Sequence, residues 1–205
     1  MKLFTSEDEA RVSRAITEAE RNTSGEIVVV VAARSDDYLY VPPLVGALLS
    51  LLVPWVLIYF TQLSVTSIYL AQLAVFLIVT TLLLPLPLRT ALAPAHVKSR
   101  HAHERAVEQF LAQNLHTTEG HTGVLIFVSV AERRAEILAD SAIDARVPAG
   151  TWKEIVDELT AAIGKGKPAD GLVAAIKAAG QHLARHFPPD TRNLNELPDH
   201  LIVLP

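Results

Sequence analysis

Two long, uncharged apolar segments separated by a short polar turn constrain what this chain can fold into. The first extends from Val41 to Phe60 and the second from Ile68 to Leu88. Each is close to the roughly 20 residues that a helix needs to cross about 30 Å of hydrocarbon. Because only Thr61 to Ser67 joins them, we expect a transmembrane helical hairpin whose two ends emerge on the same side of the membrane.

The alternative is a helical hairpin buried in the core of a soluble protein. Apolar runs in such cores usually have about 10 to 14 residues, so both of these segments are long for that role. A cleavable signal peptide is not expected, because the first apolar segment follows a charged, amphipathic stretch.

The distribution of basic residues predicts an orientation. Basic side chains lie on both flanks of the hairpin and are absent from its turn; they are Arg34 before it and Arg89, Lys98, Arg100 and Arg105 after it. The positive-inside rule then places both flanks in the cytoplasm. We therefore expect a two-span protein of the cytoplasmic (inner) membrane, with a cytoplasmic soluble domain and both termini cytoplasmic.

Composition bounds the remainder of the chain. Without the two spans, roughly 155 residues remain, enough for one modest domain. The formal net charge of −4 gives no electrostatic support for a nucleic-acid partner. The chain contains no cysteine, which excludes disulfide scaffolds, thiolate zinc sites and cysteine nucleophiles.

Helical and strand patterns alternate around the hairpin. The β-branched run Glu26–Ala33 predicts a central parallel strand, Gly123–Ala131 a second buried strand, and Arg134–Asp140 a third, antiparallel strand. Helices are expected over residues 6–22, 104–115, 151–163 and 169–186, with capping boxes at Ser6 to Glu9 and Thr151 to Glu154, and a basic connector over Pro94–His103.

This order of elements predicts an α/β fold, a three-layer sandwich with a small mixed sheet. Residues 1–40 and 89–187 would form one domain, interrupted by the hairpin at 41–88. The tail, residues 188–205, is expected to be irregular or to add a short edge segment.

Three stretches of the soluble chain carry a resemblance to a known family. They are the opening helix that continues into Thr23–Ile27 and its strand, the segment Gly123–Asp140, and the closing helices around Trp152–Ile163 and Asp170–Ile176. These stretches resemble the TPM domain family, also described as the TPM phosphatase domain. The resemblance implies a Rossmann-like α/β/α sandwich, with acid phosphatase activity or divalent-cation binding in some members. In other members it implies a role in the assembly, repair or regulation of membrane protein complexes.

The chain departs from the family pattern in its membrane segment. Members typically carry a signal peptide or a terminal anchor and expose the domain outside the cytoplasm. Here the apolar hairpin interrupts the domain after its first strand.

Acidic side chains that follow strands are the main candidates for chemistry. Asp36 and Asp37 follow the first strand, where ligands of open α/β sheets collect and where the family resemblance places an acidic strand end. Asp140 and Asp144, after the third strand, would complete a carboxylate site for Ca²⁺ or Mg²⁺. An antiparallel third strand can instead end at the opposite edge of the sheet, and the alternative is that all four are solvated turn residues.

Other clusters of basic and histidine residues are better explained by roles other than catalysis or metal binding. Lys98 and Arg100, with three histidines around them, are typical of juxtamembrane cations that meet anionic lipid headgroups; the histidines are His96, His101 and His103. His182 and His186 share a helix face, but cationic groups suit the end of a helix. The segment Gly164–Lys167 lacks the spacing of a phosphate-binding loop.

Two functional hypotheses follow. In the first, the chain is a membrane-anchored accessory or binding protein with a membrane protein partner, favoured by the hairpin and by the absence of a nucleophile motif from the sequence. In the second, it is a weak metal-dependent (acid) phosphatase in which Asp36 and Asp37 hold the cation and a bound water attacks a phosphoester.

Overall fold

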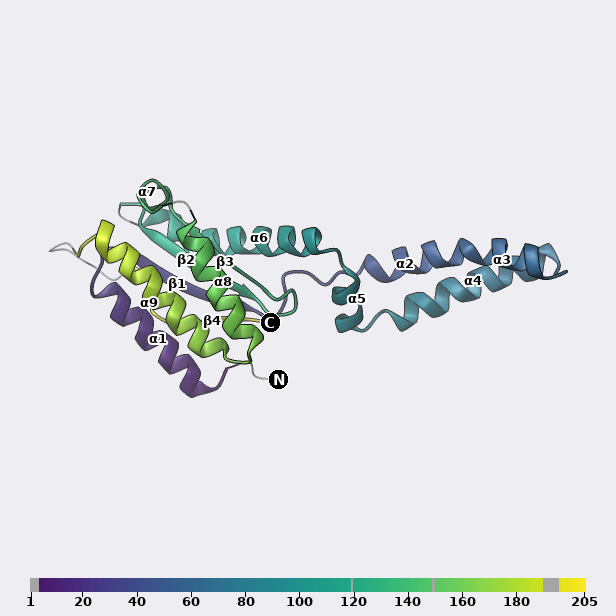
Figure 1. The fold of residues 1–205 in the computed structure, drawn as a ribbon, viewed down its shortest axis with the longest axis horizontal. Helices are drawn as coiled ribbons and strands as arrows, with labels where there is room; N and C mark the ends of the chain where they lie inside the picture. The colour runs from purple at the N-terminus through teal and green to yellow at the C-terminus, as the bar shows by residue number, and fades with distance from the viewer. Residues whose placement is uncertain (1–3, 119, 149, 190–195) are drawn as a thin grey trace. The chain divides into compact units, whose positions relative to one another are not determined.

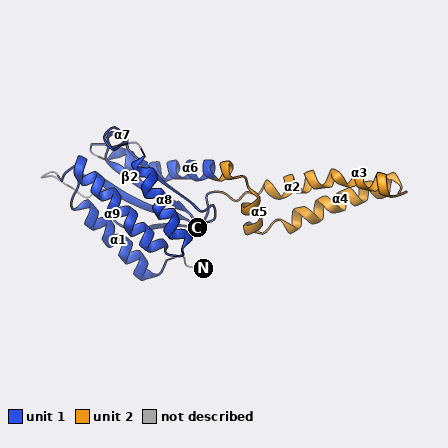
Figure 2. Cartoon of the chain, viewed as in Figure 1, with its two compact units in different colours: residues 1–35, 99–205 blue, residues 36–98 orange. Residues whose placement is uncertain are grey.

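The computed structural model describes residues 4–118, 120–148, 150–189 and 196–205. The chain forms two compact units (Figure 2). One comprises residues 1–35 and 99–205, and the other comprises residues 36–98. The smaller unit is a single insertion in the larger one, and its boundaries lie a few residues before and ten residues after the hairpin segment expected at 41–88.

A mixed sheet organises the larger unit (Figure 1). Its strand order is β3 (Arg134–Ala139), β2 (Gly123–Ser129), β1 (Glu26–Ala32) and β4 (Ile202–Leu204). β1 is parallel to both β2 and β4, whereas β3 is antiparallel to β2. The predicted α/β fold with a small mixed sheet and a central first strand is therefore confirmed.

Both faces of β1 are covered, which explains its continuous β-branched sequence. Val29 and Val31 pack in one cluster with residues from α1 (Ser6–Glu20), α8 (Thr151–Gly164) and α9 (Pro168–His186). Val28 and Val30 pack in a second cluster with Ala106 of α6 (Ala95–Ala112) and Leu115 of η1 (Leu115–Thr117). Successive side chains of a strand point to opposite faces, so every position must be apolar.

Two helix starts differ from the sequence prediction. The Thr5 hydroxyl accepts from the Asp8 N–H while the Asp8 carboxylate accepts from the Thr5 N–H, so the capping box lies one residue before the expected Ser6–Glu9. At α8 the prediction was wrong: Gly150, with φ 94°, occupies the N-cap position without a side-chain cap, and Thr151 is already helical.

The segment before the fourth predicted element also differs from its prediction. The expected connector Pro94–His103 is mostly helical, because α6 begins at Ala95 and buries only the small or amide side chains Ala102, Ala106 and Gln109. Such a face gives little apolar periodicity to detect. The tail follows the second of its two expectations, since β4 adds a short parallel edge strand beside Val30–Ala32 of β1.

The smaller unit contains the helical hairpin. Its helices are α2 (Val41–Ser50), α3 (Leu52–Phe60), α4 (Val65–Leu82) and α5 (Leu86–Leu92). Val41–Phe60 and Val65–Leu82 are long and apolar enough to cross a membrane, judged by length and composition. α4 begins earlier than expected because the Ser64 hydroxyl accepts from the Ser67 N–H and caps it.

A glycine allows the two arms of the hairpin to approach closely. A Cβ added at Gly46 would lie 2.4 Å from the Thr80 hydroxyl and 3.2 Å from the Phe76 carbonyl oxygen. Gly46 and Ser50 are buried between the arms, whereas no residue of α3 or α4 is buried. The hairpin therefore has a narrow packed seam and an apolar outer surface.

Candidate functional site

The first predicted acidic pair lies in the loop before α2. Oδ1 of Asp36 accepts from the backbone N–H groups of Asp37 and Tyr38, an Asx-type turn. Both aspartates belong to the smaller unit, and both have interaction partners. The Asp36 carboxylate therefore already holds its own turn.

The second predicted pair lies around α7 (Ser141–Asp144). The Asp140 carboxylate caps this helix by accepting from the Ser141 N–H, and it lies 3.1 Å from Nδ1 of the exposed His121. The Asp140 N–H donates to the Gly123 carbonyl at the amino end of β2. Asp140 and Asp144 thus sit at the end of the sheet opposite to the carboxyl end of β1.

The predicted carboxylates are therefore divided between two units. In the described part of the chain, no group of three or more acidic or histidine side chains is arranged to hold a metal ion. The structure does not assemble the expected Ca²⁺ or Mg²⁺ site, and cation binding stays a prediction.

The predicted histidines have separate environments. His103 lies in α6, with Nδ1 2.6 Å from the Glu136 carboxylate on β3. His182 lies in α9, and burial lowers its pKa, with smaller contributions from the charges of Arg185 and His186. Within the described residues, Nδ1 of His182 has no hydrogen-bond partner. Neither position gathers a set of metal ligands.

A polar network joins the carboxyl ends of β1 and β2. The Ser129 hydroxyl donates to the Glu132 carboxylate, and the Ser35 N–H lies 3.2 Å from each of its oxygens. The Ser35 hydroxyl donates to the Ser129 hydroxyl over 2.8 Å. Glu132 is only 6% exposed. Glu132 is not among the predicted site residues, although it follows the second strand, where the strand-end rule would have found it.

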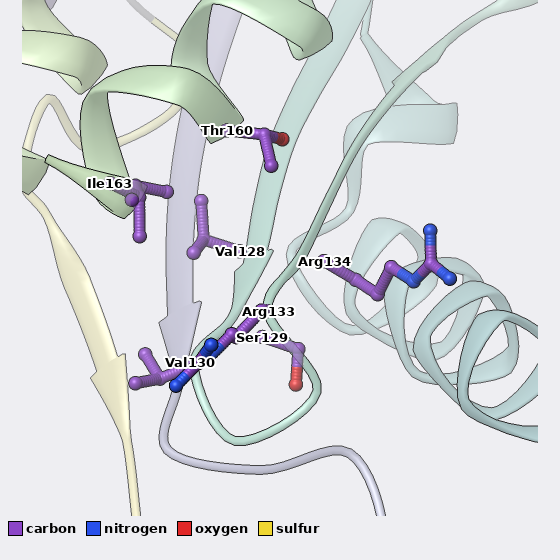
Figure 3. Close-up of a pocket in the computed structure, with 8 residues that line it drawn as sticks. Val128, Ser129, Val130, Arg133, Arg134, Thr160 and Ile163 are labelled. Atoms are coloured by element: carbon purple, nitrogen blue, oxygen red, sulfur yellow. The ribbon is translucent and has the colours of Figure 1, made fainter. Parts of the chain in front are cut away.

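A pocket of about 350 Å³ lies beside this network, between the end of β2 and the last turns of α8 (Figure 3). Val128, Val130 and Ile163 supply its apolar wall, and Thr160 adds a hydroxyl. Arg133 and Arg134 also line the pocket, and in Figure 3 the Arg134 guanidinium extends away from Thr160 and Ile163. The pocket is suited to binding an amphipathic group.

A group of carboxyls lies at the opposite end of the sheet. Oε1 of Glu20 accepts from the Ile27 N–H over 2.8 Å, and burial raises the pKa of Glu20 to about 9. The nearly buried Glu26 accepts from the Glu196 N–H, and its pKa is raised, again mainly by burial. The Thr17 hydroxyl donates to Asp199 over 2.7 Å. These contacts tie the C-terminal segment to α1 and β1.

Comparison with known proteins supports this architecture. Residues 89–182 match the family model for the TPM domain, and the resembling segment Thr23–Ile27 lies outside the match. The NMR structure of the BA42 protein from the psychrophilic bacterium Bizionia argentinensis has a similar fold. Its TM-score is 0.60 and its identity 22%, over 98% of this chain and 94% of that chain. No curated protein matches the sequence.

Proposed function

We propose that this TPM-domain protein is anchored in the cytoplasmic membrane by its hairpin and acts there as an accessory or binding protein for a membrane protein partner. The observation that carries the proposal is the apolar outer surface of α3 and α4. Trp55, Tyr59 and Phe60 are 72%, 81% and 83% exposed, and the α4 span has no buried residue. Such a surface is unfavourable in water and stable in hydrocarbon.

Strand pairing supports a hairpin with both ends on one side of the membrane. β1 and β2 pair directly from Glu26↔Gly123 to Ala32↔Ser129, although the hairpin separates them in sequence. An odd number of spans would leave these strands on opposite sides. The basic residues on both flanks favour the cytoplasmic side.

Binding is favoured over turnover by the residues at the strand ends. Glu132 and Ser129 are buried in a network that joins the strands, and Asp36 holds its own turn. The neighbouring pocket offers mainly apolar contacts. These features suit recognition of a partner segment, and the hairpin would keep the domain beside membrane-embedded partners.

Alkaline extraction of membranes tests the anchor. The full chain is expected to remain in the membrane pellet, and the Leu73→Asp/Leu77→Asp variant to be released, because both side chains lie exposed on α4. The matched control is Val107→Asp/Leu111→Asp, which places two charges at exposed apolar positions of α6. Release of the unmodified chain would contradict the proposal.

Reporter fusions test the topology separately. A reporter at residue 64, in the turn before α4, and one at the C-terminus are expected on opposite sides, with the C-terminus cytoplasmic. A periplasmic C-terminus would overturn the orientation inferred from the flanking charges.

A metal-dependent phosphatase is the second candidate, favoured by the TPM match over residues 89–182 and by the acidic pair Asp36 and Asp37 that follows β1. The test is phosphomonoester hydrolysis by the purified full chain with Mg²⁺, Ca²⁺ or chelator. Asp36→Asn/Asp37→Asn would abolish turnover, and Asp157→Asn, at an exposed ion pair with Lys153, would not. Turnover that is equal in all three proteins, or absent, would remove this candidate.

A further inference from the structure

The segment that follows the second span combines exposed leucines with basic side chains. α5 carries Leu88 and Leu92 one turn apart, 46% and 49% exposed, and Leu84 just before it is 48% exposed. Arg89 follows Leu88 directly, and His96 and Lys98 lie in the first turn of α6. Exposed leucines beside cations are typical of helices that lie at the boundary between headgroups and acyl chains.

Within the part of the chain that the structure describes, the cations of this segment have no acidic partner. Among the residues that the structure describes, no side-chain hydrogen bond or ion pair involves Arg89 or Lys98, and Nε of Arg89 is buried without a partner. The sequence contains no Asp or Glu between Asp37 and Glu104. The whole chain carries a net charge of −4, so this concentration of uncompensated positive charge is local.

We propose that α5 and the first turn of α6 form a binding surface for anionic phospholipid, with Leu88 and Leu92 against acyl chains and Arg89 and Lys98 on the headgroup phosphate. The inference rests on the proposed membrane anchor, because the surface begins a few residues after α4 ends at Leu82. An arginine guanidinium can bind two phosphate oxygens at once, and an ammonium group adds a compact charge. A lipid supplies both the anion and the apolar chains that this surface needs.

Retention of lipid by the full chain tests the proposal. The protein is reconstituted in nanodiscs of equal parts phosphatidylglycerol and phosphatidylcholine, extracted in mild detergent, and its bound lipids are counted by native mass spectrometry. The unmodified chain is expected to be enriched in phosphatidylglycerol. Arg89→Gln and Lys98→Gln should each lower the enrichment about five-fold.

The control removes one arginine and one lysine charge at positions outside the proposed surface. Arg14→Gln/Lys165→Gln lies in the larger unit and should leave the enrichment unchanged. A fluorophore on Leu88→Cys, the sole cysteine of that variant, should report an apolar environment in nanodiscs. Phosphatidylglycerol enrichment of the Arg89→Gln and Lys98→Gln variants equal to that of the control, or a fluorophore that reports water, would overturn the proposed lipid-binding surface. Failure to enter nanodiscs at all would instead contradict the membrane anchor.

Discussion

The two units of this protein use the same apolar residue types in opposite ways. In the sheet, Val29 and Phe127 are fully buried. In the hairpin, Phe60 is 83% exposed and the α4 span has no buried residue. Apolar content alone therefore does not identify the core, because the role of each apolar side chain depends on what surrounds it. In the larger unit that environment is protein, and in the smaller unit we propose that it is lipid.

Truncation of one phenylalanine in each unit should give the largest difference in stability between the units. Phe127→Ala leaves a cavity at a buried position of the sheet and should lower the free energy of unfolding by about 3–5 kcal/mol. Phe60→Ala at the turn of the hairpin should change stability by less than about 0.5 kcal/mol. Thermal unfolding of the full chain in detergent, followed by near-ultraviolet circular dichroism, measures both. Equal losses would show that the hairpin surface is packed against protein.

The packed contact between the two arms of the hairpin should tolerate added side-chain volume as poorly as a protein core does. Gly46→Val forces a side chain against Thr80 and Phe76, and overpacking of this kind costs about 1–3 kcal/mol. The two tryptophans separate the units, since Trp55 lies in α3 and Trp152 in α8. In a Trp152→Phe background, Trp55 fluorescence should show an earlier unfolding transition of the hairpin.

The control for this substitution is Gly164→Val, where no atom lies within 4 Å of the added Cβ. It should leave the Trp55 transition in place. If Gly46→Val were also silent, the two arms would not pack as closely as the structure places them.

The smallest effect on stability should come from replacing a carboxyl group in the larger unit. Burial raises the pKa of Glu20 from 4.5 to about 9, so between these values the unfolded chain releases a proton that the folded chain keeps. The contribution of Glu20 to stability therefore falls as pH rises from about 4.5 to about 9. Glu20→Gln should remove this dependence and raise the melting temperature by a few degrees at pH 8.

Trp152 fluorescence in a Trp55→Phe background measures that shift without interference from the hairpin. The expected gain disappears at pH 4, where Glu20 is protonated in both states. A gain of the same size at pH 4 and pH 8 would show that the titration of Glu20 is not its source.

The sequence predicts the sheet well because its strands are unambiguous. Continuous β-branched runs at Glu26–Ala32 and Gly123–Ser129 require two covered faces, and only an α/β sandwich supplies them. The beginning of α6 was missed because Ala102 and Ala106 are small, so its buried face gives a weak signal. β4 was not firmly predicted because three residues carry almost no periodicity.

The candidate site was predicted less well, since it depends on contacts between distant segments. The strand-end rule directed attention to the region after β1, where the Asp36 carboxylate accepts from the backbone N–H groups of Asp37 and Tyr38. Glu132 owes its importance to Ser129, three residues before it, and to Ser35, which lies 97 residues away in sequence. Local patterns do not show which of several acids will become buried.

The position of the hairpin between β1 and β2 also sets an order of events during synthesis. β1 leaves the ribosome first, but its partner Gly123–Ser129 follows only after both apolar helices have been made. Until then its valines have no sheet to join, and such a strand is prone to wrong pairing. Completion of the domain therefore waits until the whole hairpin has been synthesised, so the hairpin has time to reach its own environment before the sheet closes.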